Sequence, residues 1–511
     1  MGAGRKLLSK ARPALAAMLC LLLTCACDAS SAAYDPAPWL ADYALLKKGL
    51  QTSYANLAWF GSPQGGVDLP DLDRRTTAAL ASARSDKDAK AALTAFVRAI
   101  PDAHLQLLDP RTAAELSAQD GPDHNLLSHL FGGGACDDDD MTDGSKRGFS
   151  LPFDRAGARM IPRGGAPFAS GLYDLPGGPR VGLVRIPSFE MRQYPDLCRG
   201  AATELKLGRA PAGVDLSSLV LGGFMTFLVQ TLQDLQQRGA TAVILDVGDN
   251  PGGSDSGQIS AGLFAAAPLY SHPIWMVAGE PAAHMFDHQL TVLAAAADHT
   301  RTEPDAQRDL GAAIQAVQAR KASIPARACD MSWVWRERRP WTPSGCSNLV
   351  EAGYMSGPIQ RADWRAYADR TTAAALYAPA YLGKTQGTWR GPVYVVTDET
   401  TASAAELFSA ILQDNRAGKL VGRRTIGAGC GNQGPYRFVT LPRMRASLRV
   451  SDCVVIRADG SDEVAGVTPD IPVEGTDPVA RARETLERIS EDLRKNAPAA
   501  APARDTRPAS R

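Results

Sequence analysis

Two short segments carry residues suited to acyl chemistry, and each follows an apolar run typical of a buried strand. The first, Asp249 to Gly253, reads DNPGG, and adjacent glycines allow backbone amide hydrogens to converge on an anion. The second, Thr400 to Glu406, reads TTASAAE and places Ser403 at the expected start of a helix, where amides favour a developing negative charge. Taken alone, these segments are more typical of a tight turn and a helix cap. Their occurrence in one α/β region favours a catalytic role.

The surrounding chain alternates between predicted strands and helices. Apolar runs at 180–189, 241–250, 391–400 and 419–425 are expected to be strands, and 219–239 and 403–414 are expected to be helices. This alternation predicts a mostly parallel sheet with crossover connections. Upstream, apolar residues recur at three and four positions between 39 and 108, which predicts helices, whereas 109–180 reads as loop-rich.

Four ordered motifs resemble successive blocks of the tail-specific (C-terminal processing) and tricorn-core serine peptidases. They are VILDVGDNPGG, VYVVTDETTASAAELFSAILQD, KLVGRRTIGAG and GVTPDIPV, and the segments RVGLVRIPSF and PDAHLQLLD fit as well. The resemblance extends from about 90 to 475 and implies a crotonase-like (ClpP-like) α/β core. It also implies that Ser403, three positions before the Glu of the SAxE motif, is the nucleophile. No cofactor or metal is implied.

The departures from the family pattern select a catalytic subtype. Where the Ser/Lys branch has its lysine, this chain has Ala428, which cannot accept a proton. The tricorn or chlamydial-type branch instead takes a histidine from an early block and a glutamate from before GVxPD, and these positions are His104 and Glu463. Serine needs an adjacent base, and a carboxylate can orient the imidazole. The resemblance therefore predicts a Ser403–His104–Glu463 triad, and Asp462 is adjacent to its third member.

Other positions differ from the family as well. Ala103 stands where tricorn-type enzymes have a serine that links the histidine to the glutamate, so the link is either direct or involves Asp102. Gly248 stands where the strand motif usually has arginine. The loop of a PDZ domain that binds a carboxylate is missing from 109–180, so recognition of a substrate C-terminus is not implied. An oxyanion hole is expected from the amides of Gly252 or Gly253 and of Ala404.

The first 33 residues are typical of an export signal. Four basic residues precede an apolar run from Ala14 to Ala26 that is too short to span a bilayer comfortably. Cleavage after Ala33 and lipidation at Cys25 or Cys27 are both compatible with this pattern. We expect an exported protein that is periplasmic or associated with the cell envelope, with membrane contact only through such a lipid anchor.

Export to an oxidising compartment would affect whether the cysteines form disulfides. Six of the nine cysteines follow the signal region, and an even number in an oxidising compartment predicts disulfides, with buried free thiols as the alternative. No CxxC pair or His/Cys cluster at zinc spacing occurs, so no structural metal is expected. Nearness in sequence predicts the pairs Cys136–Cys198, Cys329–Cys346 and Cys430–Cys453.

Composition limits the function classes. The 511 residues are 45% hydrophobic and carry 55 basic and 55 acidic side chains, which indicates a globular protein and disfavours a nucleic-acid binder. The expected organisation is a signal at 1–33, a helical domain with His104 at 34–115, a loop-rich segment at 116–180, a peptidase core at 181–475 with an insertion at about 280–388, and a C-terminal helix and tail at 476–511.

The predicted function is that of an exported serine peptidase that cleaves protein or peptide substrates through an acyl-enzyme on Ser403. A catalytically silent scaffold or peptide-binding protein on the same fold is one alternative, and a non-peptide ester hydrolase is another.

The acidic run at 137–140 is expected to be a solvated loop rather than a calcium site. Core packing is expected for most of the tryptophans of the insertion, Trp333, Trp335, Trp341 and Trp364.

Overall fold

The computed structural model describes residues 34–119, 143–176, 178–209, 216–254, 256–301, 303–324, 329–433 and 437–496. The predicted signal at 1–33, Cys136, the acidic run at 137–140 and the tail beyond 496 lie outside these residues. Within the described ranges, no helix is both long and apolar enough to cross a membrane.

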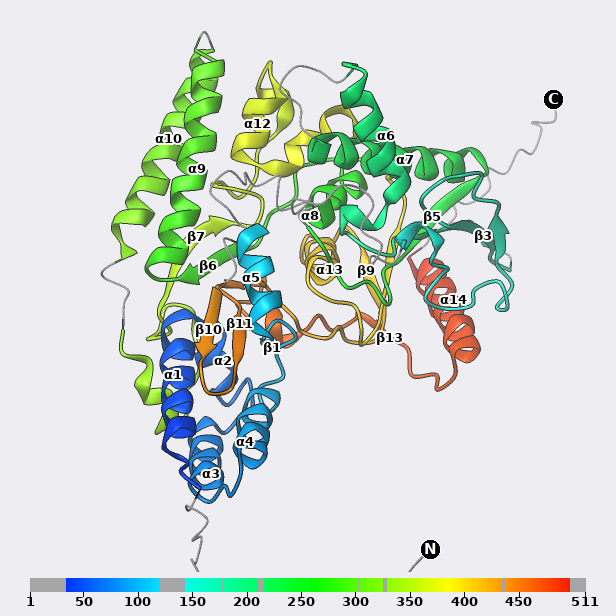
Figure 1. The fold of residues 1–511 in the computed structure, drawn as a ribbon. Helices are drawn as coiled ribbons and strands as arrows, with labels where there is room; N and C mark the ends of the chain where they lie inside the picture. Colours follow the sequence, from blue (N-terminus) through cyan, green and yellow to red (C-terminus); the bar gives the residue numbers. More distant parts are fainter. Residues whose placement is uncertain are drawn as a thin grey trace, which may run out of the picture.

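A seven-stranded sheet forms the centre of the molecule, in the order β13-β9-β8-β5-β4-β3-β2 (Figure 1). The pairings from β13 to β4 are parallel, whereas β4-β3 and β3-β2 are antiparallel. The predicted α/β class with a mostly parallel sheet is confirmed. The strands are β2 (Arg159–Ile161), β3 (Ser170–Asp174), β4 (Arg180–Arg185), β5 (Ala240–Asp246), β8 (Val393–Thr397), β9 (Lys419–Gly422) and β13 (Ile471–Pro472).

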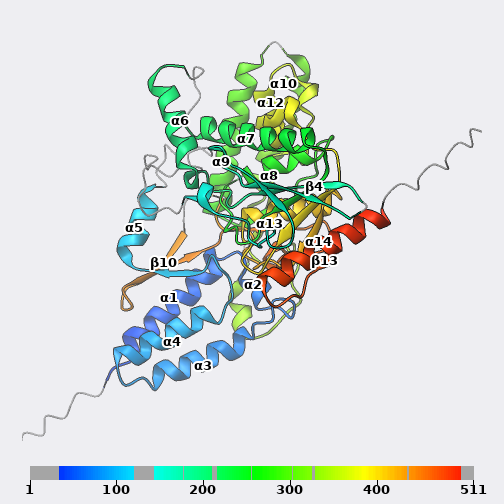
Figure 2. The same ribbon diagram turned by 90° about the vertical axis from the view of Figure 1, so that its right-hand side faces the viewer.

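Helices cover both faces of this sheet, which explains why its central strands are apolar on both sides. On one face, α7 (Leu216–Gln237), α8 (Ser256–Ala261) and α13 (Ala404–Asp414) share a core with β5 and β8. On the other face, α14 (Pro478–Lys495) packs against the same strands, and Figure 2 shows it crossing the sheet. Because β5 and β8 are parallel neighbours, the loops that follow them lie at one edge of the sheet.

The N-terminal helices are packed against the insertion. They are α1 (Ala37–Ser53), α2 (Leu57–Phe60), α3 (Leu69–Ala81) and α4 (Asp86–Arg98). Asp68 and Ser85 cap α3 and α4, since each side chain accepts a backbone N–H of the first turn. Trp333, Trp335 and Trp341 are buried in the same core as these helices, in agreement with the core role predicted for most of the tryptophans.

Two small antiparallel sheets connect distant parts of the chain. One, in the order β12-β6-β7, joins the insertion to the core, and the other, in the order β1-β11-β10, joins the segment after α4 to the C-terminal half. The second sheet matters for function because β1 begins two residues after His104. The strands are β1 (Gln106–Leu108), β6 (Pro273–Val277), β7 (Leu349–Tyr354), β10 (Arg437–Leu441), β11 (Ala446–Val450) and β12 (Cys453–Val455).

The remaining helices lie outside the central layers. The α-helices are α5 (Pro110–Gln119), α6 (Pro195–Lys206), α9 (Glu280–His299), α10 (Pro304–Ala322) and α12 (Arg370–Leu376). The short 3-10 helices are η2 (Gly144–Lys146), η3 (Met191–Gln193), η4 (Gly262–Phe264), η5 (Met331–Trp335), η6 (Trp364–Ala366), η7 (Ala378–Thr385) and η8 (Glu463–Ala465).

The expectation of loops from residue 109 onward was wrong at two places. Helix α5 begins directly after Asp109, whose side chain accepts the N–H groups of Arg111 and Thr112 and so caps the helix start. Strands β2 and β3 extend the edge of the central sheet within the segment that the sequence marked as loop-rich. Both strands are short, and their apolar residues are too few to give a clear alternating pattern.

Two of the predicted disulfides are confirmed. Cys329 pairs with Cys346, and Cys430 pairs with Cys453. Cys198 is also disulfide-bonded, and its predicted partner Cys136 lies outside the described residues.

The Cys430–Cys453 disulfide is expected to stabilise the fold. Replacing both cysteines by serine should lower the free energy of unfolding by about 2–4 kcal/mol, because the unfolded chain gains conformational entropy when the cross-link is lost. Urea unfolding without reductant measures this change. The Cys329→Ser/Cys346→Ser variant is a matched control with a similar sequence separation of 17 against 23, and should lose a similar amount. Unchanged stability of the Cys430→Ser/Cys453→Ser variant would contradict the prediction.

Candidate active site

Ser403 lies in an uncommon backbone conformation at the start of α13. Its φ is 51° and its ψ is −121°, and positive φ is costly for a residue with a side chain. Such strain persists only when the surroundings impose it. The helix begins at the next residue, so the Ser403 side chain lies at the positive end of the α13 dipole.

The DNPGG loop after β5 packs directly against Ser403. A Cβ atom at Gly252 would lie 2.8 Å from Ser403 Cβ and 2.9 Å from the Ala404 nitrogen, and φ of Gly252 is +92°. Only glycine fits there. The backbone N–H of Ala402 donates to the Asn250 carbonyl at 2.9 Å, which fixes the two loops to each other.

The backbone amides around Ser403 differ in their availability. The N–H of Gly252 donates to Asn250 Oδ1 at 2.8 Å, so it is already used within the loop. For the N–H groups of Gly253 and Ala404, no acceptor is found among the described residues. These two amides, unlike that of Gly252, are therefore candidates for binding an oxyanion.

Asp398, at the end of β8, also connects the two loops. Its carboxylate accepts the N–H of Asp249 at 3.0 Å and the hydroxyl of Thr400 at 2.8 Å. A Cβ atom at Gly248 would lie 2.8 Å from Asp398 Oδ2 and would overlap the Ser150 hydroxyl. This packing leaves no room for the arginine that the tail-specific peptidases usually have at the position of Gly248.

A buried carboxylate, that of Glu406, joins Ser403 to the loop after β9. Glu406 Oε2 accepts the N–H of Ser403 at 2.8 Å and that of Ala428 at 2.9 Å. Its Oε1 accepts the hydroxyl of Thr425 at 2.5 Å and the N–H of Gly427 at 2.8 Å. Burial raises the pKa of Glu406, and these four hydrogen bonds oppose that rise.

His104 lies on the other side of the same loop. Its Nδ1 is 3.0 Å from the Ala428 carbonyl oxygen, and its side chain is only 15% exposed. With this acceptor, the proton is held on Nδ1, and Nε2 is left as the basic nitrogen. Burial is the main factor that lowers the pKa of His104, and the charge of Arg449 lowers it further, whereas Asp102 and the Ala428 carbonyl act in the opposite direction.

The pairing of β1 with β11 brings His104 to the loop around Ala428, which is far from it in the sequence. Gln106 pairs with Arg449, and Arg449 Nε donates to the His104 carbonyl oxygen at 3.4 Å. The loop itself is held by the Cys430–Cys453 disulfide and by the Asp452 N–H, which donates to the Gly431 carbonyl at 3.1 Å. A Cβ atom at Gly431 would lie 2.9 Å from His104 Nε2.

Glu463 lies in η8, behind the same loop. Its side chain is buried, and its Oε1 has no hydrogen-bond partner in the part of the chain that the structure describes. Burial, followed by the nearby charge of Glu406, raises its pKa well above the ordinary value. No hydrogen bond or ion pair within the described residues joins Glu463 to His104.

Hydrogen bonds through Glu406 and Ala428 connect the Ser403 amide to the His104 ring. Glu406 holds both the Ser403 amide and the Ala428 amide, and the Ala428 carbonyl contacts the His104 ring. Within the described residues, the Ser403 hydroxyl makes no hydrogen bond to His104. In enzymes without substrate, such catalytic hydrogen bonds are often absent or long and tighten on binding.

Sequence reasoning missed several residues that shape the site. Glu406 was used only to locate the nucleophile, although a glutamate three positions after a helix-capping serine is a known signal of mutual capping. The contribution of Ala428 is a backbone carbonyl, which leaves no trace in side-chain patterns. Asn250 and Asp398 act by holding loops, and only the folded structure reveals their partners.

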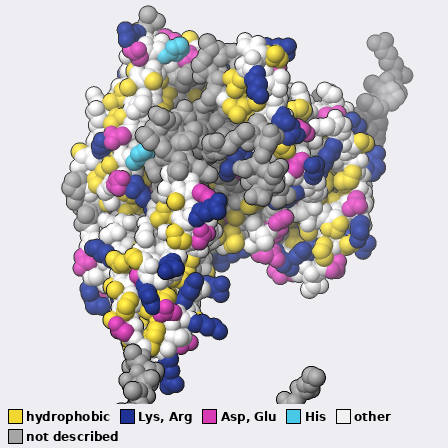
Figure 3. All heavy atoms as spheres, in the orientation of Figure 1, with side chains coloured by type: hydrophobic (Ala, Val, Ile, Leu, Met, Phe, Trp, Pro, Cys, Tyr) yellow, Lys and Arg dark blue, Asp and Glu magenta, His cyan; other side chains and the backbone are white. Residues whose placement is uncertain are grey.

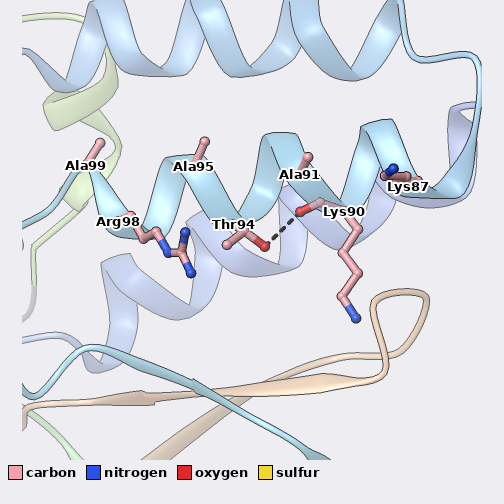
Figure 4. Close-up of a pocket in the computed structure, with 7 residues that line it drawn as sticks. All are labelled: Lys87, Lys90, Ala91, Thr94, Ala95, Arg98 and Ala99. Atoms are coloured by element: carbon pink, nitrogen blue, oxygen red, sulfur yellow. Dashed lines mark hydrogen bonds between the residues drawn. The ribbon is translucent and has the colours of Figure 1, made fainter.

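A shallow hollow on the exposed face of α4 is unrelated to this site. Figure 4 shows its lining side chains, and Thr94 Oγ1 donates to the Lys90 carbonyl at 2.8 Å. Elsewhere on the surface, basic and acidic side chains are mixed on the face shown in Figure 3, in keeping with the zero net charge.

Comparisons with known proteins identify the family. The family model described as peptidase family S41 matches residues 180–473, which is more than half of the chain. Mature CPAF has a similar solved structure, with a TM-score of 0.54, 15% identity, and coverage of 90% of this chain and 97% of that chain. Mature CPAF complexed with lactacystin matches with the same TM-score and identity, over 90% and 98% of the two chains. A search of curated proteins found no significant match.

The buried Glu406 network is expected to be essential for stability. In Glu406→Gln, an amide NH₂ would face N–H and O–H donors, which should lower the free energy of unfolding by about 1–3 kcal/mol. Glu399→Gln is a suitable control, because Glu399 is 57% exposed in an ion pair with Arg423 and should change stability by less than about 0.5 kcal/mol. Equal unfolding midpoints of the two variants in urea would refute the role of Glu406.

Gly431→Ala is expected to impair catalysis with little effect on folding. The added methyl group would press on His104 Nε2 and displace the ring. A misplacement of a catalytic group by up to about 1 Å can reduce the rate by about 10–100-fold. The rate of labelling by a fluorophosphonate measures the effect. Gly200→Ala in α6, where an added Cβ meets no atom within 4 Å, is the control and should label like the wild type. Normal labelling of Gly431→Ala would show that the ring is not held in this position.

Proposed function

The chain belongs to peptidase family S41 and is a serine peptidase, and we propose that it cleaves peptide bonds through an acyl-enzyme on Ser403 with His104 as the general base. One observation carries this proposal. Ser403 has a positive φ at the start of α13, and Glu406 ties its amide to the loop that contacts His104.

In the proposed reaction, His104 Nε2 removes the hydroxyl proton of Ser403 as its oxygen attacks the substrate carbonyl. The negative charge that develops on the carbonyl oxygen is stabilised by the amides of Gly253 and Ala404. The protonated His104 then gives its proton to the leaving amine, and an ester on Ser403 remains. Water, deprotonated by His104, attacks this ester, the C–O bond to Ser403 breaks, and His104 returns the proton to the Ser403 oxygen as the acid product leaves.

The choice of base follows from the positions of the ionisable groups. Ala428 supplies no amine, and its carbonyl instead binds the Nδ1 proton of His104. The lowered pKa of His104 favours the neutral ring, which is the form that can accept the serine proton. The resemblance to the tricorn or chlamydial-type branch predicts Glu463 as the orienting carboxylate.

The cellular setting is proposed from the sequence and the cysteines. We propose that residues 1–33 direct export to the periplasm or cell envelope, with cleavage after Ala33 or lipidation at Cys25 or Cys27. The Cys329–Cys346 and Cys430–Cys453 disulfides support an oxidising compartment. The proposed substrates are proteins or peptides.

Fluorophosphonate labelling tests the nucleophile and the base. We expect wild type to be labelled and Ser403→Ala to remain unlabelled. His104→Ala should be labelled about 10³-fold or more slowly at pH 7.5, because the catalytic residues act as a unit. Circular dichroism would establish that the variants are folded. Equal labelling of folded His104→Ala and wild type would exclude His104 as the base.

The pH dependence offers a separate test. Because burial lowers the pKa of His104, the neutral base should persist below the ordinary histidine value of about 6.5 and be lost as the pH falls through the lowered pKa. The labelling rate of wild type should therefore stay level at pH 6.5 and decline only in more acidic solution. A profile that rises steadily toward alkaline pH would instead indicate an amine base.

A further inference from the structure

The carboxylate of Asp102 lies beside the His104 ring. Asp102 Oδ1 is 3.8 Å from His104 Nδ1 and accepts the backbone N–H of His104 at 2.8 Å. The Asp102 side chain is fully buried, so little water screens its charge from the ring. The two-residue spacing fixes the carboxylate and the imidazole in one local turn.

Hydrogen-bond donors surround the Asp102 carboxylate. Its Oδ2 accepts the hydroxyl of Tyr54 at 2.7 Å, the amide of Asn56 at 3.2 Å and, more weakly, the hydroxyl of Ser451 at 3.5 Å. All of these groups, like the N–H of His104, act as donors to Asp102. A protonated carboxyl would have to turn its own O–H toward one of them, whereas a carboxylate satisfies all of them.

Two other buried acids, Asp462 and Glu463, have fewer donors than Asp102, although Asp462 Oδ1 accepts the N–H of Val464 at 3.0 Å. Asp462 Oδ2 and Glu463 Oε1 have no hydrogen-bond partner among the residues that the structure describes. Burial raises the pKa of both, and the charge of Asp102 adds to the effect on Asp462. A neutral carboxyl group at either position would provide no charge to balance a protonated imidazole.

Resting on the proposed roles of Ser403 and His104, we propose that Asp102, rather than Glu463, is the positioning residue whose negative charge stabilises the protonated ring of His104. The two tasks of the third triad member are then divided. The Ala428 carbonyl selects the Nδ1-protonated tautomer, and Asp102 balances the charge that forms when Ser403 gives up its proton.

The charged groups that face His104 set the expected pH effect. Asp102 lies on the same segment as His104, and Arg449 comes from β11, whereas the buried Asp462, whose pKa is raised mainly by burial, interacts with Asp102. The loop around Ala428 contributes only a backbone carbonyl. Loss of the Asp102 charge should therefore lower the pKa of His104, because Arg449 and burial would act with less opposition.

Asp102→Asn and Glu463→Gln form the matched test, with fluorophosphonate labelling followed from pH 4.5 to 8.5. Because the tautomer is still held, Asp102→Asn should slow labelling by about 10–100-fold and Glu463→Gln by less than about threefold. The acid midpoint should move to lower pH in Asp102→Asn alone, which a general loss of packing would not cause. A larger loss in Glu463→Gln, or an unmoved midpoint in Asp102→Asn, would overturn the proposal.

Tyr54→Phe keeps the test decisive if Asp102→Asn does not fold. Without the Tyr54 hydroxyl, one hydrogen-bond donor to Asp102 is lost, so the negative charge of Asp102 acts more strongly on the His104 ring. The acid midpoint should therefore move to higher pH. A shift to lower pH in folded Tyr54→Phe would contradict the proposal. Failure of the proposed function would look different, because wild type would then go unlabelled or Ser403→Ala and His104→Ala would label normally.

Discussion

The buried carboxylate of Glu406 is the interaction on which the site depends. It lies in the first turn of α13 and accepts hydrogen bonds from Ser403 on one side and from Thr425, Gly427 and Ala428 on the other. An acceptor in a dry interior is costly unless donors surround it, so the strand-to-helix turn and the loop after β9 have to meet there. The positive φ of Ser403 is maintained by this meeting of segments.

The second requirement is that two distant parts of the chain pack together. His104 follows the N-terminal helices, whereas Ser403 lies in the parallel-sheet core, and the β1-β11 pairing brings the histidine to the loop that Glu406 holds. The Cys430–Cys453 disulfide and the buried tryptophans of the insertion fix the surroundings of this pairing. In the proposed mechanism, assembly of His104 with Ser403 is therefore coupled to docking of the N-terminal helices.

The sequence predicted what depends on local pattern and missed what depends on long-range contact. Apolar runs located β5 and β8, and the small residues around Ser403 and Gly252 marked the loops at their ends. Helix α5 was missed because its start depends on the Asp109 cap rather than on an apolar stripe. The network around Glu406 and Ala428 was also missed, since main-chain amides and carbonyls make most of it. The donors to Asp102 come from three segments, and their convergence is visible only after folding.

In the proposed mechanism, Ser403 is acylated while the amides of Gly253 and Ala404 receive the oxyanion and His104 acts as the base. A crystal structure of the protein after reaction with a fluorophosphonate tests it most directly. We expect phosphorus bonded to Ser403 Oγ, the phosphonyl oxygen within about 2.7–3.1 Å of both amide nitrogens, and His104 Nε2 within hydrogen-bond distance of the adduct. Phosphorus on another residue, or an adduct whose oxygen faces away from Gly253 and Ala404, would contradict it.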